Sequence, residues 1–178
     1  MEIKAGDPEN LIFVDGTGVT PDMVLPYGRS PEGKRAAGTR PVSQGKRISA
    51  TGALSSEGLE ACTTFEGTLN GEVFLYYPSS FLCPVLKEGQ AVITDNAGVR
   101  KAVGVKEPIE SRGVKLLYLP PYSPELPPTE MCRSKIKHFL KKAEAGTEEI
   151  LNEALPESLN MITENDCKGR FGHCGYIV

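Results

Sequence analysis

The stretch Leu116–Glu130, LLYLPPYSPELPPTE, contains a short apolar run, then five prolines, and ends on an acid. The apolar run predicts a buried strand. The prolines cannot donate the N–H groups of a strand ladder, so they end the strand and form a rigid elbow. Pro127 or Pro128 suits the first turn of a helix, and Glu130 lies in that turn, where the helix dipole favours an acid. The stretch therefore predicts a carboxylate held in a fixed position.

The residues after the elbow, 129–146, predict a clear amphipathic helix. Its basic residues Arg133, Lys137 and Lys141 fall on the side of Glu130, away from the apolar residues. A basic face beside a carboxylate suits a phosphate-bearing polymer, although a solvated helix face has the same pattern more often. The apolar stripe is formed by Cys132, Ile136, Phe139, Leu140 and Ala143.

Two further acids accompany short buried strands. Asp15 lies within NLIFVDGTGV, where Gly16 and Gly18 mark the end of the apolar run, and Asp95 follows the strand 91–94. A carboxylate in such a place is costly unless its charge is compensated, and ligand sites gather at strand ends in open sheets. The two acids therefore suit a shared cation site, although each also suits a simple turn, because Asp-Gly and Asp-Asn are common turn pairs.

The order of predicted elements indicates an α/β protein. After the strand at 10–19 and a long Pro-, Gly- and base-rich loop, two strands follow around a turn at 55–58. The rest of the chain alternates helices with strands. We expect a mixed sheet of five strands, an antiparallel meander followed by parallel strands, flanked by helices. The expected helical segments are 70–86 with a kink at Pro78, 99–113 interrupted by Gly104 and Pro108, 129–146, and 148–162 broken near Pro156.

The composition is that of an ordinary soluble domain. The chain has 178 residues and a net charge of -3, so a basic signature for nucleic acid is absent and DNA contacts must come from local patches. Neither a membrane span nor a signal peptide is predicted, which indicates the cytosol. The five cysteines are scattered and predict reduced thiols. The group Cys167, His173 and Cys174 matches no familiar zinc spacing.

Three blocks of the sequence carry a resemblance to a known family. IFVDGTG contains Asp15, VITDNAGVRK contains Asp95, and LLYLPPYSPELPPTE ends on Glu130. Thirty-four residues lie between Asp95 and Glu130. In these blocks the chain resembles the catalytic domain of mariner-superfamily transposases and their bacterial insertion-sequence relatives, which are Asp-Asp-Glu (DDE) endonucleases. The resemblance covers nearly the whole chain, residues 1–178, as one domain.

The resemblance implies a ribonuclease H-like fold and a metal-dependent DNA transposase or endonuclease. Asp15, Asp95 and Glu130 would be both the catalytic and the metal-binding residues, holding two Mg²⁺ or Mn²⁺ ions. Two such ions activate the attacking water and stabilise the leaving oxygen of a phosphodiester. The implied partners are transposon-end and target DNA, a second copy of the chain, and a separate N-terminal helix-turn-helix module. Contacts to DNA phosphates would come from Arg29, Lys34, Arg35, Arg100, Lys137 and Lys141.

Some positions depart from the family pattern. Gly16 replaces an acid that is common after the first aspartate, and Arg100 lies near the place of a common histidine. Pro127 replaces an asparagine that would cap the next helix, a change that costs about 1 kcal/mol. Two other hypotheses therefore stay open: a decayed remnant that acts as a non-enzymatic interaction module, and a ribonuclease H-like repair nuclease.

Overall fold

A computed structural model describes residues 7–23, 25, 27–38, 45–96, 104–120, 123 and 127–176. Five strands form one sheet in the order β3-β2-β1-β4-β5. The pairs β1–β2 and β2–β3 are antiparallel, whereas β1–β4 and β4–β5 are parallel. The predicted mixed sheet, a meander followed by parallel strands, is confirmed. The strands are β1 Leu11–Val19, β2 Ile48–Leu54, β3 Leu59–Glu66, β4 Ala91–Thr94 and β5 Lys115–Tyr118.

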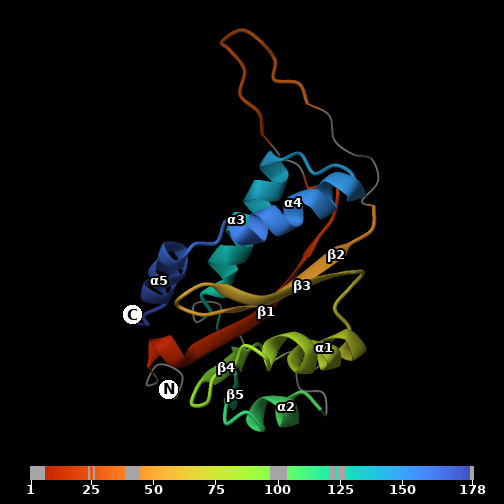
Figure 1. Cartoon of the computed structure of the whole chain (residues 1–178). Helices are drawn as coiled ribbons and strands as arrows, with labels where there is room; N and C mark the ends of the chain where they lie inside the picture. The colour runs from red at the N-terminus through yellow and green to blue at the C-terminus, as the bar shows by residue number, and fades with distance from the viewer. Residues whose placement is uncertain are drawn as a thin grey trace.

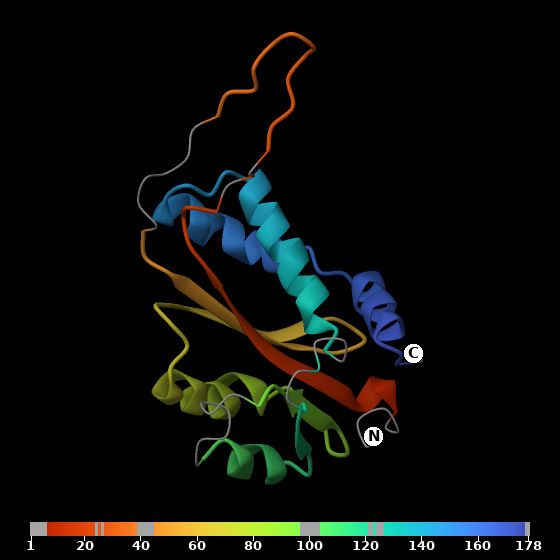
Figure 2. The same cartoon turned by 180° about the vertical axis from the view of Figure 1, so that it is seen from behind.

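Helices cover both faces of this sheet, as Figures 1 and 2 show. α1 and α2 lie on one face, and α3, α4 and α5 lie on the other. Among the described residues, no helix combines the length and the apolarity needed to cross a bilayer. The helices are α1 Gly71–Tyr77, α2 Lys106–Glu110, α3 Thr129–Lys142, α4 Glu148–Asn160 and α5 Glu164–His173, with a 3₁₀ turn at Pro8–Asn10 and a π-helical turn at Pro78–Leu82.

The alternation of side chains along β1 divides the core into two layers. Leu11 and Phe13 are buried against α3, α4 and α5, whereas Ile12 and Val14 are buried between the sheet and the helices α1 and α2. Full burial of such a side chain contributes about 1.5–3 kcal/mol. Since successive residues point to opposite faces, Asp15 lies on the face of Leu11 and Phe13, towards α3.

Several helix predictions are corrected by the structure. α1 gives way to a π-helical turn at Pro78, as the predicted kink required. Pro108, however, lies in the first turn of α2, where its missing N–H breaks no internal hydrogen bond, so it does not interrupt the helix. α4 runs through Pro156 without ending, because Leu151, Ala154, Leu155 and Ser158 are buried along one face. Packing of that face outweighs the local cost of the proline.

Two features near the C-terminus were not predicted. Residues 164–173 form α5, which a Thr163–Asp166 capping box opens. Ala143 is exposed rather than part of the stripe of α3, because α3 ends at Lys142 and Ala145 is the buried residue beyond it. Cys167 and Cys174 are buried and His173 is exposed, so the structure brings no metal site together there.

An ion pair joins α3 to α5. Lys135 Nζ lies 2.6 Å from Asp166 Oδ2, and the Thr163 backbone N–H donates to the same oxygen at 3.0 Å. Lys135 first, and then the Thr163 backbone, hold the pKa of Asp166 well below its usual range. A carboxyl whose pKa is lower in the folded state stabilises the fold above the unfolded pKa, about 3.9, and this contribution disappears as the pH falls below it.

We therefore expect Asp166→Asn to lower the free energy of unfolding at pH 7 by about 1 kcal/mol. The difference from the wild type should shrink steadily as the pH falls from 5 to 2, because the unfolded wild-type chain then takes up a proton at Asp166 that the folded chain does not. Urea unfolding at a series of pH values measures both effects. Glu164→Gln in the same helix, which removes an exposed ion pair with Lys168, should leave the thermal midpoint unchanged. A constant difference at all pH values would contradict this prediction.

A long arm connects β1 to β2. Residues 27–38 are exposed and extend away from the sheet, beyond α3 and α4 (Figures 1 and 2). At its base, the Lys46 backbone N–H donates to Glu148 Oε1 at 3.0 Å, at the start of α4. The arm carries three of the predicted phosphate-binding residues, Arg29, Lys34 and Arg35.

Candidate active site

Asp15 lies where the two halves of the sheet meet. It is the fifth residue of β1, and its antiparallel partner on β2 is Gly52. The parallel pairing of β1 with β4 ends one step earlier, at Val14 and Thr94. The interpretation of Asp15 as a turn residue is wrong, because Asp15 lies inside β1, which continues to Val19 as the predicted strand 10–19 does. Gly16 N–H donates to Asp15 Oδ1 at 2.7 Å, which helps to hold the carboxylate.

Asp95 comes directly after β4, one residue beyond the last pair between β1 and β4. Since Val14 pairs with Thr94, the same register continued by one residue sets Asp95 beside Asp15. Adjacent strands are about 4.8 Å apart, and paired residues of parallel strands point to the same face. Ile93 packs in the core layer of α3, so the alternation assigns Asp95 to that face as well. The Thr94 hydroxyl donates to the Val14 carbonyl at 3.2 Å and fixes this register.

Glu130 approaches the same place from the first turn of α3. The N-cap position is Pro128, which has no side chain able to cap the helix. Most of the predicted elbow lies outside the described residues, but the helix that follows it is confirmed. The Glu130 side chain is 59% exposed and the Asp15 side chain only 17%.

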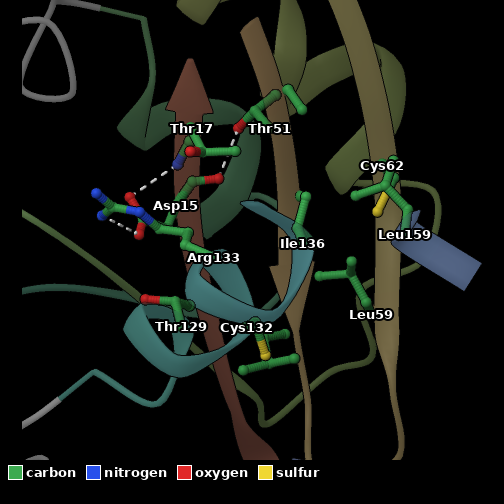
Figure 3. A pocket seen from close by; sticks show the side chains of 14 residues that line it. Asp15, Thr17, Thr51, Leu59, Cys62, Thr129, Cys132, Arg133, Ile136 and Leu159 are labelled. Carbon is green, nitrogen blue, oxygen red and sulfur yellow. Dashed lines mark hydrogen bonds and ion pairs between the residues drawn. The ribbon is translucent and has the colours of Figure 1, made fainter. Parts of the chain in front are cut away.

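Arg133 connects these acids, as Figure 3 shows for Asp15. Its Nη1 atom lies 3.0 Å from Asp15 Oδ2 and 3.2 Å from Glu130 Oε2. Burial alone would lower the pKa of Arg133, but the charges of Asp15, Glu130 and Asp95 raise it above its usual value. One guanidinium thus contacts Asp15 and Glu130 directly, and the charge of Asp95 acts on it as well.

A small cavity lies beside Asp15 and Arg133. Its volume is about 40 Å³, and Thr17, Thr129, Cys62, Cys132 and Leu159 contribute to its lining. Burial raises the pKa of Cys62 to about 11 and that of Cys132 to about 12. Both thiols therefore stay protonated at neutral pH, and the cavity offers no thiolate as a nucleophile. The chemistry of this site is that of carboxylates.

The donor set suits a hard divalent cation. Magnesium and manganese prefer carboxylate oxygens, which the three acids provide, and a cationic group already lies among them. As the side chains stand, no three His, Cys, Asp or Glu residues within the described ranges are close enough to hold a metal ion. A guanidinium keeps its carboxylates farther apart than a metal ion does, because its contacts are near 3 Å rather than about 2.1 Å.

The predicted phosphate-binding residues are dispersed. Lys137 and Lys141 follow Arg133 along α3, half-buried. Arg29, Lys34 and Arg35 belong to the exposed arm, residues 27–38, which extends beyond the C-terminal end of α3 (Figure 2). Arg100 lies outside the described residues.

Sequence reasoning missed the contact of Arg133 with the acids. It assigned this residue to a basic helix face, together with Lys137 and Lys141. The spacing of three residues from Glu130 signalled a helical ion pair. Nothing in the sequence signalled the contact with Asp15, which is 118 residues away and depends on how α3 packs on β1.

Solved structures share this architecture. A pre-cleavage Mos1 transpososome matches with a TM-score of 0.72 and 15% identity, over 93% of this chain and 55% of that one. A Mos1 mariner paired-end complex with Mn matches with a TM-score of 0.69 and 18% identity, over 94% and 53%. The catalytic domain of Mos1 mariner transposase matches with a TM-score of 0.63 and 14% identity, over 94% and 78%.

These likenesses show a ribonuclease H-like fold, and the chain spans about half the length of the first two chains. No curated protein sequence matches the chain. A family profile described as DDE superfamily endonuclease matches residues 10–152, most of the chain and all three acids. The chain therefore belongs to the DDE superfamily of endonucleases.

Proposed function

We propose that this chain is the catalytic domain of a DNA transposase, which hydrolyses phosphodiester bonds and transfers strands at transposon ends. The observation that supports this most is the meeting of Asp15 and Glu130 at one guanidinium, with Asp95 one residue beyond the Val14–Thr94 pair of β1 and β4. Three carboxylates from three separate elements are the donor set that divalent-metal phosphoryl chemistry requires.

Each acid has its own role in this proposal. Asp15 would be shared by two ions, with Asp95 and Glu130 completing one site each. The bound ions would supply an activated water or 3′-hydroxyl and stabilisation of the leaving oxygen. The rigid sheet fixes two of the ligands, and the first turn of α3 fixes the third. Such positioning is the chain's own contribution to the reaction.

DNA would be held by the arm and by α3. The matching structures include Mos1 complexes with paired transposon ends, so we propose a second copy of the chain and a separate end-recognition region as partners. Arg29, Lys34, Arg35, Lys137 and Lys141, together with Arg100, would bind phosphates. Phosphate contacts position DNA without reading its sequence.

The test of this function is cleavage of labelled transposon-end DNA with Mg²⁺ or Mn²⁺, with an end-recognition module supplied. Metal-dependent nicking at the end boundary is the expected result. Binding of DNA without cleavage at any metal concentration would favour a non-enzymatic interaction module. Cleavage confined to damaged or RNA-containing duplexes would favour a repair nuclease.

The contribution of the arm can be measured separately. Each phosphate contact adds about -0.9 to the slope of log Kobs against log salt. We expect Arg29→Ala, Lys34→Ala and Arg35→Ala, combined, to flatten the slope by up to about 3, equally on end and scrambled duplexes. The matched control is the combination of Lys87→Ala, Lys106→Ala and Lys115→Ala, which removes the same charge from exposed residues near the β4–β5 side. An unchanged slope in the arm variant would remove the arm from DNA binding.

A further inference from the structure

The Arg133 guanidinium lies in the space that a metal ion bound by Asp15 and Glu130 would occupy. A single nitrogen, Nη1, contacts the Asp15 and Glu130 carboxylates together. The two carboxylate oxygens are therefore no farther apart than the sum of these contacts. Oxygens that share one magnesium ion lie within about 4 Å of each other. The guanidinium thus occupies the space between two of the proposed ligands.

This contact differs from an ordinary pair on a helix surface. The link to Glu130 has the helical spacing of three residues and would by itself contribute only about 0.2–0.5 kcal/mol. The link to Asp15 crosses from α3 to β1, and its carboxylate is largely buried. Arg133 Nε is also buried, without a hydrogen-bond partner among the described residues. The side chain is held at the carboxylates at the cost of leaving this N–H unsatisfied.

A guanidinium and a divalent ion compete for these oxygens. Both are cations, and both need the same lone pairs of Asp15 and Glu130. Two cations at such short range repel each other strongly in a partly buried site. Without any cation, the neighbouring carboxylates would repel one another, so the guanidinium neutralises them as long as no divalent ion is bound.

We propose that Arg133 is a built-in counter-ion of the carboxylate site, which a divalent ion must displace from Asp15 and Glu130 in order to bind. Arg133 then sets the metal affinity of the domain, and it stabilises the metal-free form. This inference rests on the proposed function, because it takes the same carboxylates as metal ligands. It concerns a residue that the three-acid pattern does not include.

The test is Mn²⁺ binding without DNA, at low ionic strength, followed by the electron paramagnetic resonance signal of free Mn²⁺. The variants are Arg133→Gln, which keeps a polar side chain but removes the charge, and Lys142→Gln as the control. Lys142 is exposed on the same helix, nine residues and about 13 Å further along. We expect Arg133→Gln to bind Mn²⁺ at least tenfold more tightly than the wild type. Lys142→Gln should stay within twofold of the wild type.

Asp15→Asn separates the possible failures. If the wild type binds Mn²⁺, Asp15→Asn does not, and Arg133→Gln binds no more tightly than the wild type, the metal site stands and the counter-ion role is overturned. If neither the wild type nor Arg133→Gln binds Mn²⁺ at millimolar concentration, the proposed function and this inference both fail.

A second measurement uses the wild-type chain and so does not depend on the folding of a variant. Nitrogen-15 NMR of arginine side chains detects hindered rotation of a guanidinium held by two carboxylates. Mg²⁺ should release this hindrance at Arg133 over the concentration range in which it binds. Mg²⁺ binding with an unchanged Arg133 signal would overturn the proposal.

Discussion

We expect Asp95→Asn to lower the rate of metal-dependent DNA cleavage by at least about 10³-fold, equivalent to about 4 kcal/mol of lost transition-state stabilisation. Asparagine keeps the shape of the side chain but removes a ligand charge. The half-buried Asp95 comes directly after β4, so the substitution leaves the strand pairing intact. The thermal midpoint should therefore stay nearly unchanged or rise slightly, because repulsion among the carboxylates falls.

The cleavage rate and the thermal midpoint should be measured on the same preparations. Asp22→Asn serves as the matched control, since Asp22 follows the far end of β1, accepts a hydrogen bond from the Thr20 hydroxyl, and lies outside the candidate site. This control should cleave at the wild-type rate. Undiminished cleavage by Asp95→Asn would remove Asp95 from the mechanism.

The second large effect concerns stability. We expect Phe171→Ala to lower the free energy of unfolding by about 3–5 kcal/mol. The Phe171 side chain is fully buried and meets Phe13 of β1 edge-to-face, with ring centroids 5.5 Å apart and an interplanar angle of 85°. It also packs against Tyr176, at 5.8 Å between ring centroids. Truncation leaves a cavity beneath the strand that carries Asp15.

Denaturant unfolding of the variant measures this loss. His173→Ala provides the control in the same helix, where the side chain is exposed, and should change stability by no more than about 0.5 kcal/mol. A loss below about 1 kcal/mol for Phe171→Ala would mean that α5 is not part of the cooperative core.

The sheet was predictable from the sequence because its signals are local. The apolar runs of β1, β4 and β5 and the turn between β2 and β3 predict five strands, a meander followed by parallel strands. α3 was predictable for the same reason, since the helical spacing of its apolar residues and the acid in its first turn are both local features of the sequence. The change from α-helix to a π-helical turn at Pro78 also follows from a local property, the missing N–H of proline.

The errors concern features that depend on packing. α4 continues through Pro156 because its buried face holds it against the sheet and α3, which no local preference reveals. α5 is polar and contains Gly169 and Gly172, so its period is weak. Its capping box, Thr163 with Asp166, was the signal that could have identified it.

The candidate site was predictable in its acids but not in its cation. Asp15 and Asp95 interrupt or follow apolar strands, and such acids stand out in a sequence. Arg133 looks like any other base on a helix face. Its contact with Asp15 exists only because α3 packs across β1, and this docking is decided by residues spread over the whole core.

The register between β1 and β4 has a consequence for how this sequence can change during evolution. Because side chains alternate faces, inserting or deleting one residue between Ala91 and Asp95 would turn the acid towards α1 and α2. Substitutions among Ala91, Val92, Ile93 and Thr94 keep that parity as long as the strand stays apolar. Apolar substitutions are therefore tolerated in β4, whereas the insertion or deletion of a single residue is not. In this part of the chain, the number of residues before Asp95 sets the face on which the acid lies, and the identity of those apolar residues does not.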